Sequence, residues 1–232
     1  MASDRPVLEL TAARPRSEPG EVAPPAVTLR LMPGELALID ARDADRAAWF
    51  ADLCCGLMPL AEGSVHFLGH DWAAMPAHYA AALRGRISRV FAAGGWVAFL
   101  DMTTNILLPQ LHHTRDDPAA LREEAAALAR GFGLPGLPTG LPGSLSAADL
   151  ARAACVRAFL GDPALLLLET PVQGRFVELF VRLLNALALA RQNGAAAIWL
   201  TGSDLVWGDR TVPAAHRLRL RDYGLMSVRR AA

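Results

Sequence analysis

Side chains that could bind phosphate or a metal ion follow two apolar runs of this chain. Arg42 and Arg46 come after the run 36–39, and Glu169 follows the run 165–168. Carboxylates are common ligands of divalent cations, and guanidinium groups pair well with phosphate oxygens. All 23 basic side chains are arginine. A phosphate-binding loop of the Walker A type uses a lysine to reach the β- and γ-phosphates, so no complete loop of that type is present.

The composition is that of a globular protein with no preference for nucleic acid or for a lipid surface. The 23 arginines balance 23 acidic residues, the formal net charge is +0, and 53% of the 232 residues are apolar. We therefore expect no nucleic-acid partner, and membrane association only through a protein partner. No signal-peptide pattern and no stretch long enough to span a membrane is found. The 3 cysteines lie in apolar surroundings and predict free thiols in a reducing cytoplasm.

Apolar periodicity predicts strands that alternate with helices. The predicted strands are 7–10, 27–31, 36–39, 63–69, 87–91, 164–168 and 195–200, and the predicted helices are 49–57, 116–131, 147–160 and 175–191. This alternation is typical of an α/β fold with a largely parallel sheet flanked by helices. The helix-rich range 92–160 interrupts it. We expect one domain over 1–232 that contains a helical subdomain at 92–160.

The order of these segments resembles the nucleotide-binding domain of ABC transporters over nearly the whole chain. Residues 34–40 match the strand that enters the P-loop, and residues 55–59 and 62–65 match the stretch after the first helix. The resemblance implies a P-loop NTPase-like ABC cassette, with a mainly parallel core sheet, antiparallel N-terminal strands and a helical subdomain. It also indicates where the nucleotide-binding motifs should lie.

Counting back from Gly56 places the Walker A pattern G-x-x-G-x-G-K-[ST] on residues 41–48. The residues there are Ala41, Arg42, Asp43, Ala44, Asp45, Arg46, Ala47 and Ala48. Ala47 stands at the lysine and Ala48 at the magnesium-binding hydroxyl, and the glycines that let backbone N–H groups surround phosphates are absent. We expect a strand–turn–helix that binds nothing. The alternative is an unusual anion site that uses Arg42 or Arg46, near the start of the helix.

The signature LSGGQ-x-x-R is the most specific match to the family. It falls on Leu145, Ser146, Ala147, Ala148, Asp149 and, at the final position, Arg152. Only the leucine, Ser146 and Arg152 match. In the family the two glycines approach the γ-phosphate held by the opposite subunit, so Ala147 and Ala148 predict a poor signature.

The remaining motifs have also lost residues that the resemblance requires. Glu169 stands at the magnesium aspartate of Walker B and is a weak metal candidate, while Thr170 replaces the catalytic glutamate and is too weak a base to take its role. Ala92 replaces the Q-loop glutamine, and Gly202 or Ser203 falls at the switch histidine. Residues 172–176 contain no D-loop aspartate, and no aromatic residue precedes Trp49 to stack on adenine.

Residues 99–109 are closer to the family pattern, in a region that faces the membrane subunit of ABC transporters. Together with residues 171–174, the stretch 91–109 looks most like Mla-type cassettes, which drive lipid trafficking between bacterial membranes. One interpretation is that the transmission surface is better kept than the catalytic one, and the alternative is that these residues serve only helix packing.

These features predict a pseudo-ATPase subunit of a bacterial ABC transport complex, with no catalytic residues and no cofactor. Its expected partners are a permease, a second cassette, or both, in a homo- or heterodimer. Its expected place is cytoplasmic, peripheral to the inner membrane through the permease. One alternative is a divergent but active ATPase that uses ATP and magnesium with Glu169 and Arg42 or Arg46. A further alternative is a regulatory scaffold unconnected with transport.

Overall fold

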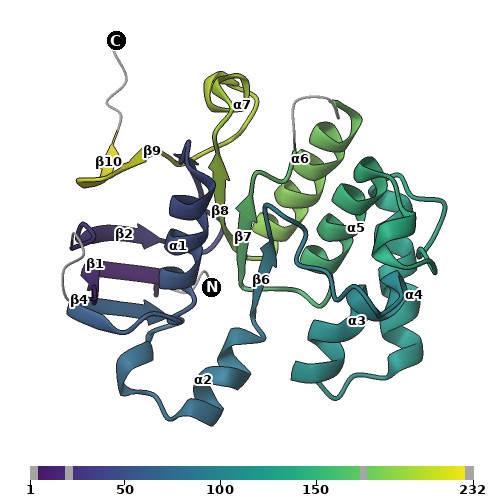
Figure 1. Ribbon diagram of the computed structural model, residues 1–232, viewed down its shortest axis with the longest axis horizontal. Coiled ribbons are helices and arrows are strands. Elements are labelled where there is room, and N and C mark those ends of the chain that lie inside the picture. The colour runs from purple at the N-terminus through teal and green to yellow at the C-terminus, as the bar shows by residue number, and fades with distance from the viewer. Residues whose placement is uncertain (1–4, 19–22, 173–176, 228–232) are drawn as a thin grey trace.

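The computed structural model describes residues 5–18, 23–172 and 177–227. A six-stranded sheet forms its centre (Figure 1). The strand order is β10-β9-β3-β8-β7-β6. These strands are β3 (Leu36–Asp40), β6 (Ile87–Val90), β7 (Leu165–Glu169), β8 (Ala196–Thr201), β9 (His216–Arg221) and β10 (Gly224–Ser227). All neighbouring pairs are parallel except β9 and β10. The predicted α/β fold with a mainly parallel core sheet is confirmed.

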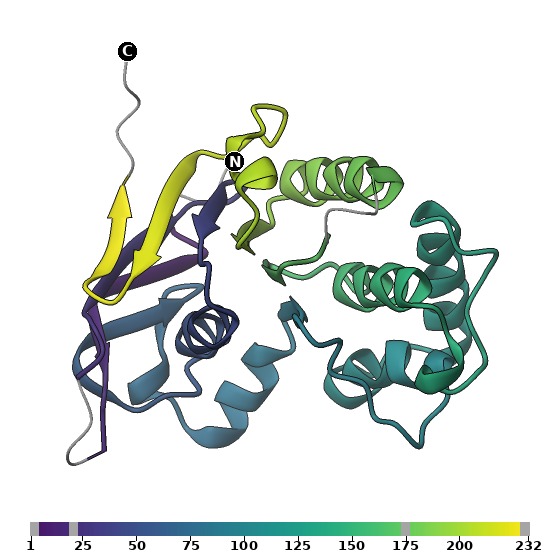
Figure 2. The ribbon, with the colours of Figure 1, turned by 45° about the horizontal axis from the view of Figure 1, so that its top comes forward.

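A second, antiparallel sheet has the order β2-β1-β4-β5. Its strands are β1 (Leu8–Pro15), β2 (Val27–Leu31), β4 (Leu60–Phe67) and β5 (His70–Asp71). The predicted antiparallel N-terminal strands are therefore confirmed. Helix α1 (Ala44–Cys54) lies between this sheet and the central sheet, and its apolar face packs on both (Figure 2).

Helices also lie on the other side of the central sheet. Helices α5 (Ala147–Phe159) and α6 (Val177–Gln192) pack on its strands, and α3 (Met102–His113) and α4 (Pro118–Gly131) pack on α5. Helices α2 (Ala77–Arg84) and α7 (Asp204–Gly208) lie at the periphery. Short 3-10 helices occur at Trp72–Ala74 and Pro142–Ser144. Helices α3, α4 and α5 gather on one side of the molecule (Figure 1). They fall within 92–160, and the boundaries of a helical subdomain stay a prediction.

The central strands are buried on both faces, as their continuous apolar sequences require. Because side chains alternate along a strand, Leu36 and Leu38 join the core beneath α3–α6, whereas Ala37 and Ile39 join the core around α1. Strand β7 divides its leucines in the same way. Because β3, β6, β7, β8 and β9 are parallel, their carboxyl ends lie at one edge of the sheet. Loops and helix starts bring polar residues together at that edge.

The first helix begins earlier than its apolar spacing predicts. Its N-cap is Asp43, whose carboxylate accepts hydrogen bonds from the backbone N–H groups of Asp45 and Arg46. At the other end, Gly56 has φ +62°, and a Cβ there would lie 2.3 Å from the Trp72 ring. The predicted start of α6 at 175 lies outside the described residues, and within them no helix is long and apolar enough to cross a membrane.

Candidate functional site

The candidate site lies at the edge where β3, β7 and β8 end. Strand β3 runs into residues 41–43 and then α1, and β8 runs into 202–203 and then α7. Glu169 ends β7 and is buried. The structure thus brings the positions matched to Walker A, Walker B and the switch to one edge of the sheet.

The positions matched to Walker A form a short turn and the first turns of α1. Ala41 is buried and its N–H donates to the carbonyl oxygen of Thr201 at 2.9 Å. Residues 44–48 are helical, and the Ala47 N–H donates to the Asp43 carbonyl oxygen at 3.0 Å. The Asp43 carboxylate holds the amides of Asp45 and Arg46. The helix N-terminus is therefore capped by its own chain, with a negative charge where an anion would bind.

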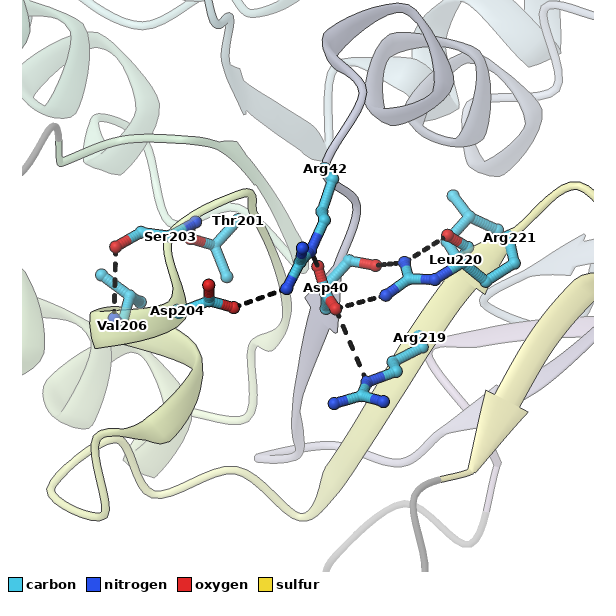
Figure 3. Close-up of polar contacts among 9 residues, drawn as sticks. All are labelled: Asp40, Arg42, Thr201, Ser203, Asp204, Val206, Arg219, Leu220 and Arg221. Carbon is cyan, nitrogen blue, oxygen red and sulfur yellow. Dashed lines mark hydrogen bonds and ion pairs between the residues drawn. The ribbon is translucent and has the colours of Figure 1, made fainter.

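Neither arginine of this segment is free of an acidic partner. The Arg42 Nη2 donates to Asp204 Oδ1 at 2.7 Å, and its Nε lies 3.7 Å from Asp40 Oδ1 (Figure 3). Arg46 forms an ion pair with Asp222. These contacts tie α1 and the segment before it to α7 and to the β9–β10 turn, and they compete with any bound anion.

Asp40, the last residue of β3, is a buried carboxylate surrounded by arginines (Figure 3). Arg221 donates to its Oδ2 at 2.5 Å and to its backbone oxygen at 2.9 Å. The Arg219 Nε lies 3.6 Å from the same Oδ2. A buried carboxylate is costly unless it is paired and hydrogen-bonded, so this cluster holds the end of β3 against β9.

Glu169 is paired with Arg89, which comes from β6. The Arg89 Nε donates to Glu169 Oε1, its Nη1 donates to Asp52 Oδ1 at 2.5 Å, and its Nη2 donates to the Ala48 carbonyl oxygen at 3.3 Å. Burial disfavours the guanidinium charge, but the hydrogen bonds to Glu169 and Asp52 outweigh burial and raise the pKa of Arg89. The positive charge of Arg89 thus lies between two groups. One is Glu169, the carboxylate matched to Walker B, and the other is the backbone of Ala48, which is matched to the magnesium-binding hydroxyl.

Thr170 follows Glu169 in an unusual backbone conformation. Its φ is +45°, a region that β-branched residues rarely adopt. Its N–H donates to the Leu200 carbonyl oxygen at 2.9 Å. Thr170 lines a cavity of about 230 Å³ together with Ala92 and Ala147, so the structure brings together the positions matched to the catalytic glutamate, the Q-loop and the signature.

The signature segment is closed by contacts of its own. The Ser146 Oγ accepts a hydrogen bond from the Asp149 N–H at 3.1 Å and donates to Asp149 Oδ2 at 2.8 Å. Arg152 pairs with Asp149 at 3.0 Å and lies 3.8 Å from Glu178 of α6. Leu145 lies just before this cap, and Ala147 and Ala148 begin α5.

The switch positions form the start of α7. Ser203 is the N-cap, and its Oγ accepts a hydrogen bond from the Val206 N–H at 3.5 Å (Figure 3). A Cβ on Gly202 would lie 3.5 Å from the Arg42 backbone, in ordinary contact. Neither residue offers an acid or a base. The segment matched to the D-loop lies outside the described residues at 173–176.

Two residues of the site were missed by sequence analysis, Arg89 and Asp40. A signal for Arg89 existed, because it is a lone cation in the predicted strand 87–91, which ends just before the Q-loop position Ala92. Strands β6 and β7 are indeed neighbours, with Arg89 opposite Leu167. Asp40 was visible only as the end of an apolar run. Its partners Arg219 and Arg221 lie about 180 residues away, which local patterns do not connect.

Comparison with known proteins finds relatives that are ATP-binding proteins. The lipoprotein-releasing system ATP-binding protein LolD of Granulibacter bethesdensis is 30% identical over 202 residues, covering 85% of this chain and 88% of LolD. The cell division ATP-binding protein FtsE of Escherichia coli is 26% identical over 152 residues, covering 66% of this chain and 68% of FtsE. No protein-family model matches the sequence.

Solved structures agree with this result at the level of the fold. The dimeric structure of the ATP-binding cassette MJ0796 in a post-hydrolysis state, bound to ADP and Pi, has a TM-score of 0.81. It is 18% identical and covers 96% of this chain and 99% of its own. The fold is therefore that of an ATP-binding cassette.

The chain belongs to the family of ABC transporter ATP-binding subunits that includes LolD. The predicted resemblance to ABC nucleotide-binding subunits is confirmed. A lipoprotein-releasing relative is also consistent with the likeness to lipid-trafficking cassettes.

Proposed function

We propose that this chain is a non-catalytic ATP-binding-cassette subunit of a bacterial transport complex, in which protein side chains occupy the nucleotide-binding edge. The observation that carries the proposal is the contact of Arg89 with Glu169, Asp52 and the Ala48 carbonyl oxygen. This guanidinium supplies a fixed positive charge to the carboxylate that a magnesium ion would need.

The residues present do not fit ATP with magnesium. A metal ion would have to displace Arg89 from Glu169, whose side chain is only 2% exposed. It would then find Ala48 in place of a hydroxyl ligand. The phosphates would meet the Asp43 carboxylate on the first amides of α1. Nucleotide and magnesium would therefore break an ion pair or a hydrogen bond that the chain makes with itself at each of these positions. These internal contacts favour the site without a bound nucleotide.

The same contacts argue against a divergent ATPase built on Glu169 with Arg42 or Arg46. Arg42 pairs with Asp204 and Asp40, and Arg46 pairs with Asp222. Arginines that already neutralise carboxylates attract phosphate weakly, since the net local charge is small. Thr170 also lacks a side chain that can take a proton from water near neutral pH.

The subunit would act through a permease, a second cassette, or both, as a homo- or heterodimer. Exposed apolar side chains on and beside α3 favour a protein partner there: Phe99 is 82% exposed, Leu108 40% and Leu141 52%. Binding at this surface would hold the protein at the cytoplasmic side of the inner membrane. The lipoprotein-releasing relative makes a lipid-modified or hydrophobic cargo the first class to consider.

Affinity capture of the full chain from its native membrane, followed by an ATPase assay, tests this proposal. We expect a permease to co-purify, and any ATPase activity to belong to another cassette subunit. A Phe99→Asp variant should lose the permease, whereas Arg130→Asp, at an exposed position of α4, should retain it. Magnesium-dependent turnover by this chain alone that Glu169→Ala abolishes would establish the divergent ATPase instead. Capture without any permease would favour a regulatory scaffold.

A further inference from the structure

A buried arginine outside the proposed site holds the loop that joins β6 to α3. Arg157 lies on α5 and is 8% exposed. Its Nη1 donates to the Gly95 carbonyl oxygen at 2.8 Å and its Nη2 donates to the Gly94 carbonyl oxygen at 2.6 Å. Among the described residues no carboxylate forms an ion pair with it, and burial lowers the pKa of Arg157 to about 10. A buried cation without an acidic partner needs another source of stabilisation.

Two aromatic rings provide that stabilisation. The Arg157 guanidinium carbon lies 4.2 Å from the centroid of the Trp96 ring and 5.6 Å from that of Phe91. The Phe91 ring also lies 4.5 Å from the guanidinium carbon of Arg89. Contacts of this geometry are favourable and strengthen when water is excluded. Phe91 therefore connects the arginine that pairs with Glu169 to the arginine on α5.

The loop backbone is shaped to make these contacts. Gly94 and Gly95 have φ values of +81° and +58°, and a Cβ on them would lie 2.6 Å from the Trp96 indole and 2.8 Å from the Phe91 ring. Further along, the Asn105 amide of α3 holds the loop by accepting from the Val97 N–H at 2.8 Å and donating to the carbonyl oxygens of Val97 and Leu100. The loop is thus fastened at α5 and at α3.

We propose that Arg157, Phe91 and Arg89 form an interlayer clamp that fixes the 91–101 loop to both α5 and the central sheet without any ligand. Contacts within the chain alone therefore set the position of the loop and of Phe99 within it. Opening it requires Arg157 to leave two carbonyl oxygens and two rings, and removes the connection that Phe91 makes between Arg157 and Arg89. This inference goes beyond the proposed function, because the contacts of Arg157 hold whether or not a nucleotide or a permease binds.

Amide hydrogen exchange of the full chain, read by mass spectrometry, tests the clamp. We expect Arg157→Met to speed exchange in residues 94–101 by about tenfold, since the loop loses two hydrogen bonds and two cation–π contacts. Arg157→Lys should behave similarly, because a lysine keeps the charge but not the paired donors or the planar face. Arg182→Met is the matched control, since Arg182 also donates to a backbone carbonyl oxygen, that of Gly131, but is exposed.

The shared ring gives a second, independent test. Phe91→Leu should also speed exchange in residues 94–101. Arg157→Met should add less in that background than in the native chain, because the contact between Arg157 and Phe91 is already lost while the hydrogen bonds to Gly94 and Gly95 remain. Full additivity of the two changes would overturn the shared role of Phe91. Unchanged exchange in 94–101 for Arg157→Met, or an increase spread evenly over the chain, would overturn the clamp. Neither result would bear on whether ATP binds.

Discussion

At the scale of single residues, the charged groups of this cassette neutralise one another. Arg89 pairs with Glu169 and Asp52, Arg42 pairs with Asp204, and Asp43 caps α1. The substitutions were readable in the sequence, but their consequence was not. A missing lysine shows only that an interaction is lost, whereas the structure shows which charged side chains of the site pair with one another instead.

A substitution of Asp40 tests how much the arginine cluster around it contributes to the stability of the fold. We expect Asp40→Asn to lower the free energy of unfolding by about 2 kcal/mol, less than for a fully buried pair because Arg42 and Arg219 are partly exposed. Urea unfolding measures this change. Asp116→Asn is the control, since Asp116 is exposed and should alter the free energy by less than about 0.5 kcal/mol. Equal effects of the two substitutions would show that the cluster contributes nothing.

At the scale of elements, continuous apolar strands were the most predictable part of the fold. The predicted strands 27–31, 36–39, 164–168 and 195–200 fall within a residue or two of β2, β3, β7 and β8. Helix α3 was not predicted as a separate helix, because Pro109 lies inside it and its apolar residues are not confined to one face. Helix α1 starts earlier than predicted because Asp43 acts through a cap rather than through apolar spacing.

Because Asp43 caps α1, we expect its substitution to lower the free energy of unfolding by an amount that phosphate does not influence. Asp43→Ala should lower the free energy of unfolding by about 1 kcal/mol, because two helix-start amides lose their acceptor. Asp43→Ser should retain most of it, since a serine hydroxyl can accept the same hydrogen bond. Thermal unfolding with and without inorganic phosphate measures both effects. Strong stabilisation of Asp43→Ala by millimolar phosphate would instead reveal an anion site that the aspartate normally fills.

At the scale of the whole molecule, two apolar cores on either side of the central sheet hold the site residues in place. The family could be predicted from the sequence, because the order of segments is a property of the chain. The pairings could not, since Arg89 and Glu169 are 80 positions apart and Asp40 and Arg221 are 181 apart. Such contacts depend on which strands become neighbours.

The reactivity of the three cysteines shows whether both apolar cores are intact, because Cys155 lies in one core and Cys54 and Cys55 lie in the other. Burial raises the pKa of Cys55 to about 11 and that of Cys155 to about 12, and it raises the pKa of Cys54 as well. We therefore expect none of the three to react with a thiol reagent at pH 8 in the folded protein, and all three to react in urea. The free energy of unfolding should also fall as the pH rises above about 9, because thiols of the unfolded chain ionise first. Fast labelling of the native protein would contradict this burial.

Calorimetric titration of the purified full chain with ATP and magnesium tests the central claim most directly. We expect no saturable heat at ligand concentrations up to about 1 mM, and the same result for Thr170→Glu, because restoring a base does not release Glu169 from Arg89. A cassette with intact Walker motifs is the positive control. Saturable binding with a Kd of about 10 μM or tighter, lost in Glu169→Ala, would show that the site remains open to nucleotide and would contradict the account.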